Sequence, residues 1–141
     1  MLEPELLVAL EGHLGKLVHD VDLVFRKDES SASAEMAEFL GDVCALSPRI
    51  GLEESDVARY RPSFSIQRRG GGISVDFAAI PMGHEFSSFV LALLQVGGHP
   101  PVVAPELQAE IASVAGQHVF ETVVSLSCQK CPDVVQALNI M

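Results

Sequence analysis

The sequence predicts an α/β fold in which short strands alternate with amphipathic helices, and three observations support this class. Apolar residues recur at helical spacing in several stretches. Runs of β-branched and aromatic residues, bounded by charge or glycine, lie between those stretches as expected of strands. The order helix, strand, loop, helix occurs twice along the chain. With 141 residues, 48% of them hydrophobic, the chain has enough apolar material for a packed core.

The first part of the chain, residues 1–98, has the pattern of a complete unit. Leucines three or four residues apart predict its first helix, and apolar residues at helical spacing behind a Ser33 cap predict the second. β-branched runs predict the strands, and the last two flank a glycine-rich turn typical of a hairpin. A final helix that is apolar on nearly every face is expected to be buried. In order, these elements are a helix over 6–17, a strand over 21–25, a helix from Ser33 to 46, strands over 50–52, 63–66 and 73–77, and a helix over 86–96.

The second part, residues 99–141, follows a break at G-G-H-P-P. Its pattern repeats the start of the first part, with a proline suited to the first turn of its last helix. In order, we expect a helix over 105–115, a strand over 119–124, the motif C-Q-K-C, and a helix over 132–140.

An internal alignment supports the repeat. When residues 132–138 are placed on residues 34–40, Cys128 and Cys131 fall on Ser30 and Ser33. The first copy therefore has S-x-x-S where the second has C-x-x-C. The second copy stops before the strands that would complete its sheet, so we expect a fragment of a longer protein. Exposed edges on the 119–124 strand would invite pairing with another chain, including a homodimer.

Charge excludes several classes of partner. The formal net charge is −10, and such a surface repels phosphate backbones and anionic lipids. Nucleic acid and membrane surfaces are therefore not expected partners. No apolar run approaches the roughly 20 residues that span a bilayer. The acidic N-terminus lacks the features of a secretory signal, and we expect a cytoplasmic location.

The cysteine pair is the strongest functional signal. Cys128 and Cys131 lie two residues apart between a predicted strand and a helix that begins with proline. A helix N-terminus lowers the pKa of a nearby thiol through its unpaired N–H groups and positive dipole end. We therefore expect Cys128 to be the nucleophile and Cys131 the resolving thiol. Lys130 adds a positive charge that is expected to point into solvent.

Other interpretations of these residues stay open. A zinc site would need further ligands, and the chain has no second cysteine pair; an inert buried pair is the other alternative. Cys44 lies on the apolar stripe of a helix and is expected to pack as a small hydrophobe. Pro62 is either a cis proline beside the dithiol or an ordinary strand-edge proline. Glu85 is either a helix-capping acid or a partly buried carboxylate that exchanges protons with the thiols.

Two motif-rich stretches carry a family resemblance. P-M-G-H-E-F-S-S-F-V-L-A-L-L-Q-V-G-G-H-P-P and F-E-T-V-V-S-L-S-C-Q-K-C-P-D-V-V-Q-A-L-N closely resemble the N-terminal domain of AhpF, the flavoenzyme component of alkyl hydroperoxide reductase. The resemblance is dense over 81–141 and looser over 1–80. It implies two thioredoxin-like folds: a complete first fold over 1–98 that has lost the cysteine motif, and the truncated start of a second over 99–141 that carries C-x-x-C.

The resemblance also implies a function. Electrons would pass from NADH through FAD, in a flavin-containing C-terminal portion, to the dithiol of Cys128 and Cys131, and then to the peroxiredoxin component, AhpC. The acidic residue near that dithiol would be Glu85. No cofactor is expected in this segment, because FAD and NADH belong to the remainder of the full-length protein. The segment also lacks the proline loop expected to face the cysteines in a complete second fold.

Two further hypotheses compete with this electron-transfer module. The first fold, with its apolar 86–96 helix, could serve as a docking or assembly scaffold in a fragment without redox competence. Alternatively, two chains could share a zinc ion between their cysteine pairs. Reactivity of Cys128 below pH 8 would separate the electron-transfer module from the scaffold, and metal analysis would test the shared zinc ion.

Overall fold

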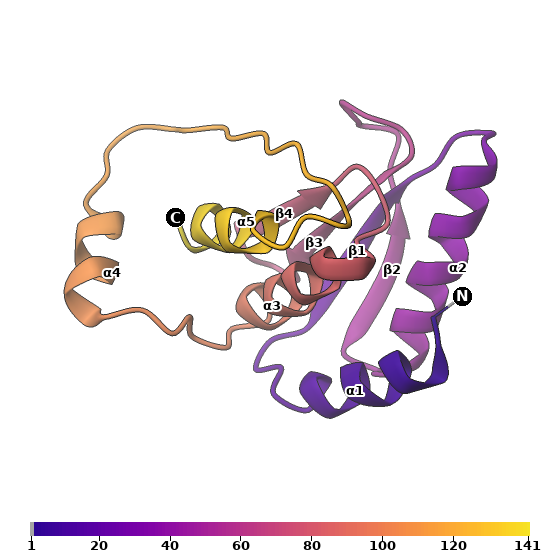
Figure 1. Cartoon of the computed structure of the whole chain (residues 1–141), viewed down its shortest axis with the longest axis horizontal. Coiled ribbons are helices and arrows are strands. Elements are labelled where there is room, and N and C mark those ends of the chain that lie inside the picture. Colours follow the sequence, from indigo (N-terminus) through magenta and orange to yellow (C-terminus); the bar gives the residue numbers. More distant parts are fainter. Residues whose placement is uncertain (1) are drawn as a thin grey trace.

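The computed structural model describes residues 2–141. Figure 1 shows a sheet with packed helices, and one long segment, residues 102–126, leaves this body; it is called the excursion below. The elements are, in chain order, α1 (Pro4–Leu14), β1 (Val21–Arg26), α2 (Ser31–Ala45), β2 (Ile50–Glu54), β3 (Ser63–Arg68), β4 (Ser74–Phe77), the 3-10 turn η1 (Gly83–Glu85), α3 (Phe86–Val96), α4 (Pro105–Ala112) and α5 (Cys131–Ile140).

The four strands form one sheet in the order β2-β1-β3-β4. β1 pairs in parallel with β2 and antiparallel with β3, and β3 pairs antiparallel with β4. The four strands predicted over residues 21–77 are confirmed to within two residues at each end. The predicted hairpin is confirmed as well, and its turn contains Gly70 with φ +70°, a conformation that glycine adopts without strain.

One face of the sheet forms the core with α2 and α3. Phe25 and Phe64 lie opposite each other on β1 and β3, and both are buried. The Phe39 ring of α2 has its centroid 6.1 Å from that of Phe64 and 5.1 Å from that of Phe89 on α3. Side chains from two helices and a strand therefore meet at one point. As predicted, α3 spans residues 86–96 and most of its side chains are buried.

The start of α2 corrects one prediction. The cap is Ser30 and not Ser33, and the helix begins at Ser31. The Ser30 hydroxyl accepts a hydrogen bond from the Ser33 N–H at 3.2 Å, which satisfies one of the free donors of the first turn. Ser33 itself is buried, and its Oγ accepts from the Asp28 N–H at 3.0 Å.

The second part of the chain corrects another prediction. Residues 119–124, expected as a strand, form no strand. The β-branched pattern is present, but no neighbouring strand accepts the backbone hydrogen bonds of this segment, and an isolated strand does not form. Its side chains project into solvent, with Val123 94% exposed. α4 is set apart from the sheet on the same excursion of the chain (Figure 1), and it contains no buried residue.

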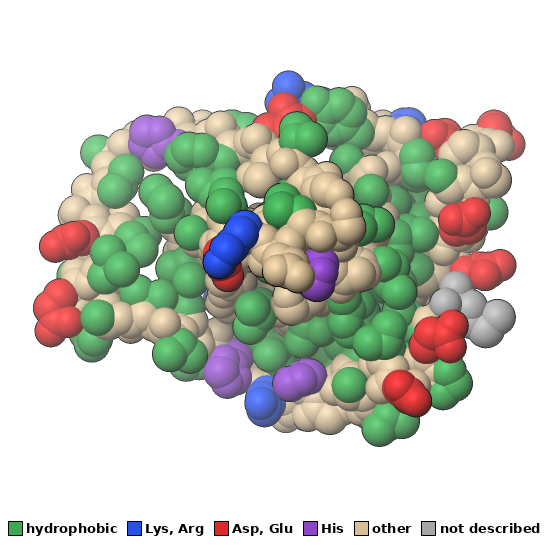
Figure 2. Space-filling view, in the orientation of Figure 1, with side chains coloured by type: hydrophobic (Ala, Val, Ile, Leu, Met, Phe, Trp, Pro, Cys, Tyr) green, Lys and Arg blue, Asp and Glu red, His purple; other side chains and the backbone are tan. Residues whose placement is uncertain are grey.

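After this excursion the chain returns to the first unit. α5 packs beside α3 and η1, which places the cysteine pair next to the start of α3 (Figure 1). Figure 2 shows apolar side chains gathered over the excursion, while acidic side chains lie mainly at the periphery of this face. The exposed large hydrophobic residues of the excursion are Val102, Leu107, Val114, Val119, Phe120, Val123, Val124 and Leu126.

Candidate active site

The two cysteines lie at the start of α5. Cys131 is the first residue of the helix, and Cys128 occupies the turn that precedes it. The Cys131 N–H donates a hydrogen bond to Cys128 Sγ at 3.2 Å, so the helix terminus directs a backbone donor at the expected nucleophile. The Cys128 N–H in turn donates to the Ser125 carbonyl at 2.9 Å, which closes the turn. Both thiols are free and half-buried.

The segment that the predicted repeat aligns with the cysteine pair contains one equivalent hydrogen bond. At the start of α2, the Ser33 N–H donates to Ser30 Oγ at 3.2 Å, as the Cys131 N–H does to Cys128 Sγ. In both pairs, the side chain of the first residue accepts a hydrogen bond from the backbone N–H of the residue three positions later. The register that aligns S-x-x-S with C-x-x-C stays a prediction, because α2 begins at Ser31 and α5 at Cys131, two positions apart in that register. The domain boundary at residue 98 stays a prediction.

The surroundings make one thiol more acidic than the other. The pKa of Cys128 is lowered, first by a hydrogen bond with the Cys131 thiol and then by the N–H groups of Lys130 and Cys131. Burial and the negative charge of Glu85 act against this lowering. The pKa of Cys131 is raised, first through its hydrogen bond with Cys128, and also by burial and by the negative charges of Cys128 and Glu85. This difference is the one that a nucleophile and a resolving thiol require.

Glu85 is buried close to the dithiol, with 2% of its surface exposed. It occupies the residue before α3, yet its side chain caps no backbone N–H group. Instead, Oε2 accepts a hydrogen bond from Ser88 Oγ at 2.7 Å, and Oε1 has no hydrogen-bond partner among the described residues. The cap interpretation therefore lacks its defining hydrogen bond. A buried carboxylate whose charge acts on both sulfurs suits proton exchange, and that role stays a proposal.

The turn that contains Glu85 also touches the cysteine loop directly. The His84 N–H donates to the carbonyl oxygen of Leu126 at 3.0 Å. Gly83 has φ +58°, and a Cβ at that position would lie 2.5 Å from the same oxygen. Gly83, His84 and Ser88 lie in a stretch quoted for the family resemblance, but sequence reasoning gave none of them a role. The spacing of Ser88 from Glu85, one helical turn, is the one signal that could have indicated a bond between them.

The other residues singled out from the sequence lie in ordinary environments. Cys44 is half-buried on α2, and burial raises the pKa of its thiol to about 11, as expected of a packing residue. The Arg61–Pro62 peptide bond is cis, and it precedes β3 as predicted. Lys130 is exposed. Over residues 2–141, no group of three or more His, Cys, Asp or Glu side chains is arranged to hold a metal ion.

The turn from β1 to α2 does not fit a dinucleotide. Such cofactors bind where a glycine-rich turn joins a strand to a helix and leaves the helix N–H groups free for the pyrophosphate. This turn instead contains Asp28, whose Oδ1 accepts from the Ser30 N–H at 2.9 Å, and the first turn of α2 is capped by Ser30 Oγ. An acidic, self-capped turn does not suit FAD or NADH.

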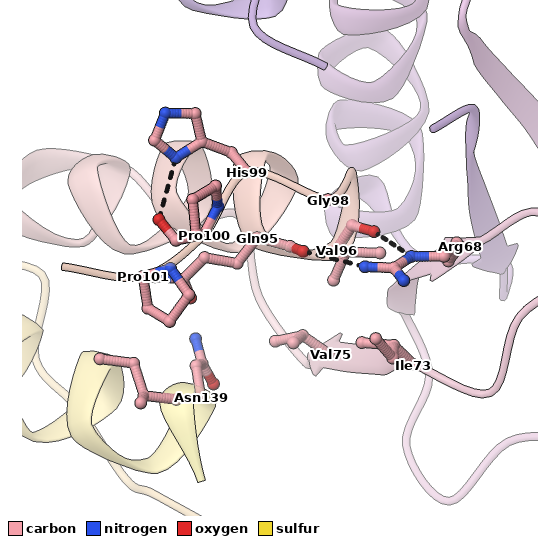
Figure 3. Close-up of a pocket in the computed structure, with 11 residues that line it drawn as sticks. Arg68, Ile73, Val75, Gln95, Val96, Gly98, His99, Pro100, Pro101 and Asn139 are labelled. Atoms are coloured by element: carbon pink, nitrogen blue, oxygen red, sulfur yellow. Dashed lines mark hydrogen bonds between the residues drawn. The ribbon is translucent and has the colours of Figure 1, made fainter. Parts of the chain in front are cut away.

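A hollow of about 280 Å³ lies at the seam between the end of α3 and the end of α5 (Figure 3). Its most polar side chain, Arg68, caps α3: Nε donates to the Val96 carbonyl at 2.8 Å and Nη2 to the Gln95 carbonyl at 3.4 Å. His99 Nδ1 lies 3.1 Å from the carbonyl of the adjacent Pro100. Arg68 and His99 are therefore engaged with the backbone, whereas Gln95 Oε1 and Asn139 Nδ2, which line the same hollow, are buried without a hydrogen-bond partner among the described residues. Within residues 2–141, no helix combines the length and apolar character needed to traverse a bilayer.

Fold and site together define a thioredoxin-like protein with a cysteine pair at a helix start. At the level of the fold, a protein disulfide oxidoreductase from Aeropyrum pernix has a TM-score of 0.79 at 17% identity, over 98% of this chain and 66% of that one. The N-terminal domain of the alkyl hydroperoxide reductase AhpF from Enterococcus faecalis has a TM-score of 0.83 at 28% identity, over 99% of this chain and 73% of that one. The predicted thioredoxin-like fold class is confirmed.

Sequence comparison finds relatives of higher identity. The alkyl hydroperoxide reductase AhpF of Pseudomonas putida is 45% identical over 141 residues, and that of Escherichia coli K12 is 44% identical over 142 residues. Each similarity covers the whole of this chain but only 27% of the relative. No protein-family model matches the chain. The resemblance seen in the motifs is confirmed: the chain is similar throughout to the N-terminal domain of AhpF.

Proposed function

We propose that this chain is a thiol–disulfide electron-transfer module of a peroxiredoxin reductase. The hydrogen bond from the Cys131 N–H to Cys128 Sγ is the observation that carries this proposal. The similarity to AhpF and to disulfide oxidoreductase folds supports an oxidoreductase role. In the proposed relay, electrons reach the dithiol from a flavin-containing portion of the full-length protein and leave to the peroxiredoxin AhpC. The chain spans 27% of the length of its relatives, and a cytoplasmic location remains our prediction.

The transfer step follows from the unequal acidity of the thiols. The Cys128 thiolate attacks one sulfur of the peroxiredoxin disulfide, forming a mixed disulfide and releasing the other peroxiredoxin sulfur as a thiolate that takes up a proton. Cys131 then loses its proton and attacks Cys128 Sγ. This second exchange forms the Cys128–Cys131 disulfide and releases the second peroxiredoxin thiol. Two electrons and two protons pass from this chain to the peroxiredoxin. A dithiol of the flavin-containing portion reverses both exchanges.

Glu85 is the proposed proton acceptor in the second exchange. The raised pKa of Cys131 means that this thiol needs a base before it can attack. The Glu85 carboxylate is buried beside the pair and keeps Oε1 free of hydrogen bonds to described residues. No step in this chain is assigned to FAD or NADH, which would act in the flavin-containing portion.

A redox titration tests the proposal. The reduced chain is equilibrated in glutathione buffers of graded potential, its thiols are trapped with a maleimide, and the products are separated by mass. We expect one two-electron transition to a Cys128–Cys131 disulfide, with Cys44 free throughout. Cys128→Ser and Cys131→Ser should each abolish this transition. Independent oxidation of the two thiols, or a wild-type chain that forms no internal disulfide, would refute the module.

The scaffold hypothesis has its own supporting observation, the exposed apolar side chains of the excursion. Under that hypothesis Cys128 has ordinary reactivity and the chain binds partners through its apolar surface. The rate of Cys128 alkylation between pH 6 and pH 9 separates the two functions, because an activated thiol reacts well below pH 8.

The homodimer was expected to form through a strand edge at residues 119–124, but these residues form no strand. We propose instead that it forms through the exposed apolar side chains of the excursion. Analytical ultracentrifugation over a range of concentrations measures it.

A further inference from the structure

The contact between η1 and the cysteine loop has an unusual position in the molecule. Among the described residues, the bond from the His84 N–H to the Leu126 carbonyl is the only backbone hydrogen bond that joins residues 102–141 to residues 2–98. Glu121 also meets the exposed Arg59, at 3.2 Å, and the Tyr60 side chain, but exposed polar pairs contribute little. The register of the cysteine loop against the first unit therefore depends on the Leu126 contact and on the packing of α5 against α3.

Glycine is required at position 83 for two separate reasons. Its φ of +58° lies in the left-handed region, where other residues are strained. In addition, a Cβ would lie 2.5 Å from the Leu126 oxygen, a separation that would force the backbone of the cysteine loop away. Gly70 offers a natural comparison, because it has φ +70° but no atom within 4 Å of its Cβ position.

The contact lies between the two groups that the chemistry brings together. Leu126 is two residues before Cys128, and Glu85 is two residues after Gly83. η1 holds the Glu85 backbone through the bond from the Glu85 N–H to the Met82 carbonyl at 3.1 Å. Moving the loop off the turn would thus increase the separation between the buried carboxylate and both sulfurs.

We propose that the Gly83–His84 peptide is a positioning element that holds the dithiol loop against Glu85 through the Leu126 carbonyl. This inference rests on the proposed electron-transfer function and extends it to residues of the first, cysteine-pair-free unit. Gly83 and His84 act through Glu85 and do not touch the reacting sulfurs. Residues of the first part of the chain, 2–98, thereby set the environment of a dithiol that lies in the second part, 102–141.

The test compares Gly83→Ala with Gly70→Ala in the full chain with Cys44→Ala. The pH dependence of Cys128 alkylation is the main measurement. Because the charge of Glu85 opposes the Cys128 thiolate, loss of the contact should lower the midpoint pH by about 0.3 or more. Gly70→Ala should leave the midpoint unchanged. Glu85→Gln should lower it in the otherwise unaltered chain, but should add almost nothing to Gly83→Ala, since both changes remove the same interaction.

A second measurement does not depend on the variant folding. In the unmodified chain, NMR hydrogen exchange should show the His84 amide protected at least tenfold relative to an unstructured peptide. An unprotected His84 amide would overturn the inference. Equal midpoints for Gly83→Ala and Gly70→Ala, or full additivity of Gly83→Ala with Glu85→Gln, would overturn it as well. Failure of the dithiol to form a disulfide would instead contradict the proposed function, and it would leave these readouts intact.

Discussion

The acidity of Cys128 depends on its neighbour more than on any other single group. The Cys131 thiol is the largest cause of the lowered pKa of Cys128, ahead of the backbone N–H groups. We predict that Cys131→Ala raises the pH midpoint of Cys128 alkylation toward the value of about 8.5 of a free thiol. The measurement is the alkylation rate against pH by mass spectrometry, in a chain with Cys44→Ala to remove the third thiol. An unchanged or lower midpoint would show that the backbone donors determine the acidity.

Ser88 is the second residue whose role can be measured directly. Its hydroxyl is buried and is the hydrogen-bond donor to the buried Glu85 carboxylate. Ser88→Ala leaves that oxygen without its partner, and we predict a loss of about 1–3 kcal/mol in the free energy of unfolding. Ser87→Ala is the matched control, because the Ser87 hydroxyl is exposed and bonds only to the His84 carbonyl, so its loss should stay within about 0.5 kcal/mol. Urea unfolding at pH 7 compares the two, and equal losses would contradict the prediction.

At the scale of elements, the predicted repeat aligns Ser30 and Ser33 with the cysteine pair, and this alignment can be tested. Ser30 and Ser33 share one hydrogen bond with the cysteine pair: the Ser33 N–H donates to Ser30 Oγ as the Cys131 N–H donates to Cys128 Sγ, although Ser30 caps its helix and Cys128 lies two residues before the cap of α5. We predict that Ser30→Cys combined with Ser33→Cys forms an internal disulfide under mild oxidation.

The background for that experiment is a chain in which Cys44, Cys128 and Cys131 are replaced, so that only the new pair can react. Trapping with a maleimide after oxidation counts free thiols: none should remain in the double variant, and one should remain in each single variant. Two free thiols in the oxidised double variant would show that the two helix starts differ in geometry, and it would weaken the repeat.

The elements also show what the sequence could and could not predict. α3 was predicted to the residue because its apolar pattern is long and its neighbours are glycine-bounded loops. The strand at 119–124 was predicted wrongly, since β-branched residues report a preference for a pleated surface and not the presence of a partner strand. The α2 cap was predicted at Ser33, one turn after the observed cap at Ser30, because serine favours the N-cap wherever it occurs and serines stand at positions 30, 31 and 33.

The candidate site likewise has features that the sequence predicted and features that only the structure shows. The cysteine pair was found from its spacing, which is local in sequence, whereas for Glu85 the sequence left open a helix-capping acid and a partly buried carboxylate, and its burial is seen only in the structure. The contact of Gly83 and His84 with Leu126 could not be found, because it joins backbone atoms of two segments that are far apart in the chain. A backbone contact of this kind has no side-chain signature other than the glycine that permits it.

At the scale of the whole molecule, the chain combines a packed unit with an excursion that has little to hold it. The first unit encloses a continuous core, whereas neither α4 nor α5 contains a buried residue. α4 spans eight residues, and isolated helices shorter than about 12 residues are marginal in water. Local stability should therefore differ sharply along the chain.

Hydrogen exchange with mass spectrometry tests that division. We predict strong protection of peptides from β1, β3 and α3, almost none over residues 102–124, and intermediate protection of α5, which is held by α3 and by the Leu126 contact. Phe89→Ala removes the ring at the centre of the core and should cost about 3–5 kcal/mol, reducing protection of the sheet and of α5 together. Leu107→Ala, on the exposed α4, should change neither. If α5 kept its protection while the sheet lost it, the dithiol would be ordered independently of the first unit. That result would contradict the proposal that the Gly83–His84 peptide positions the dithiol.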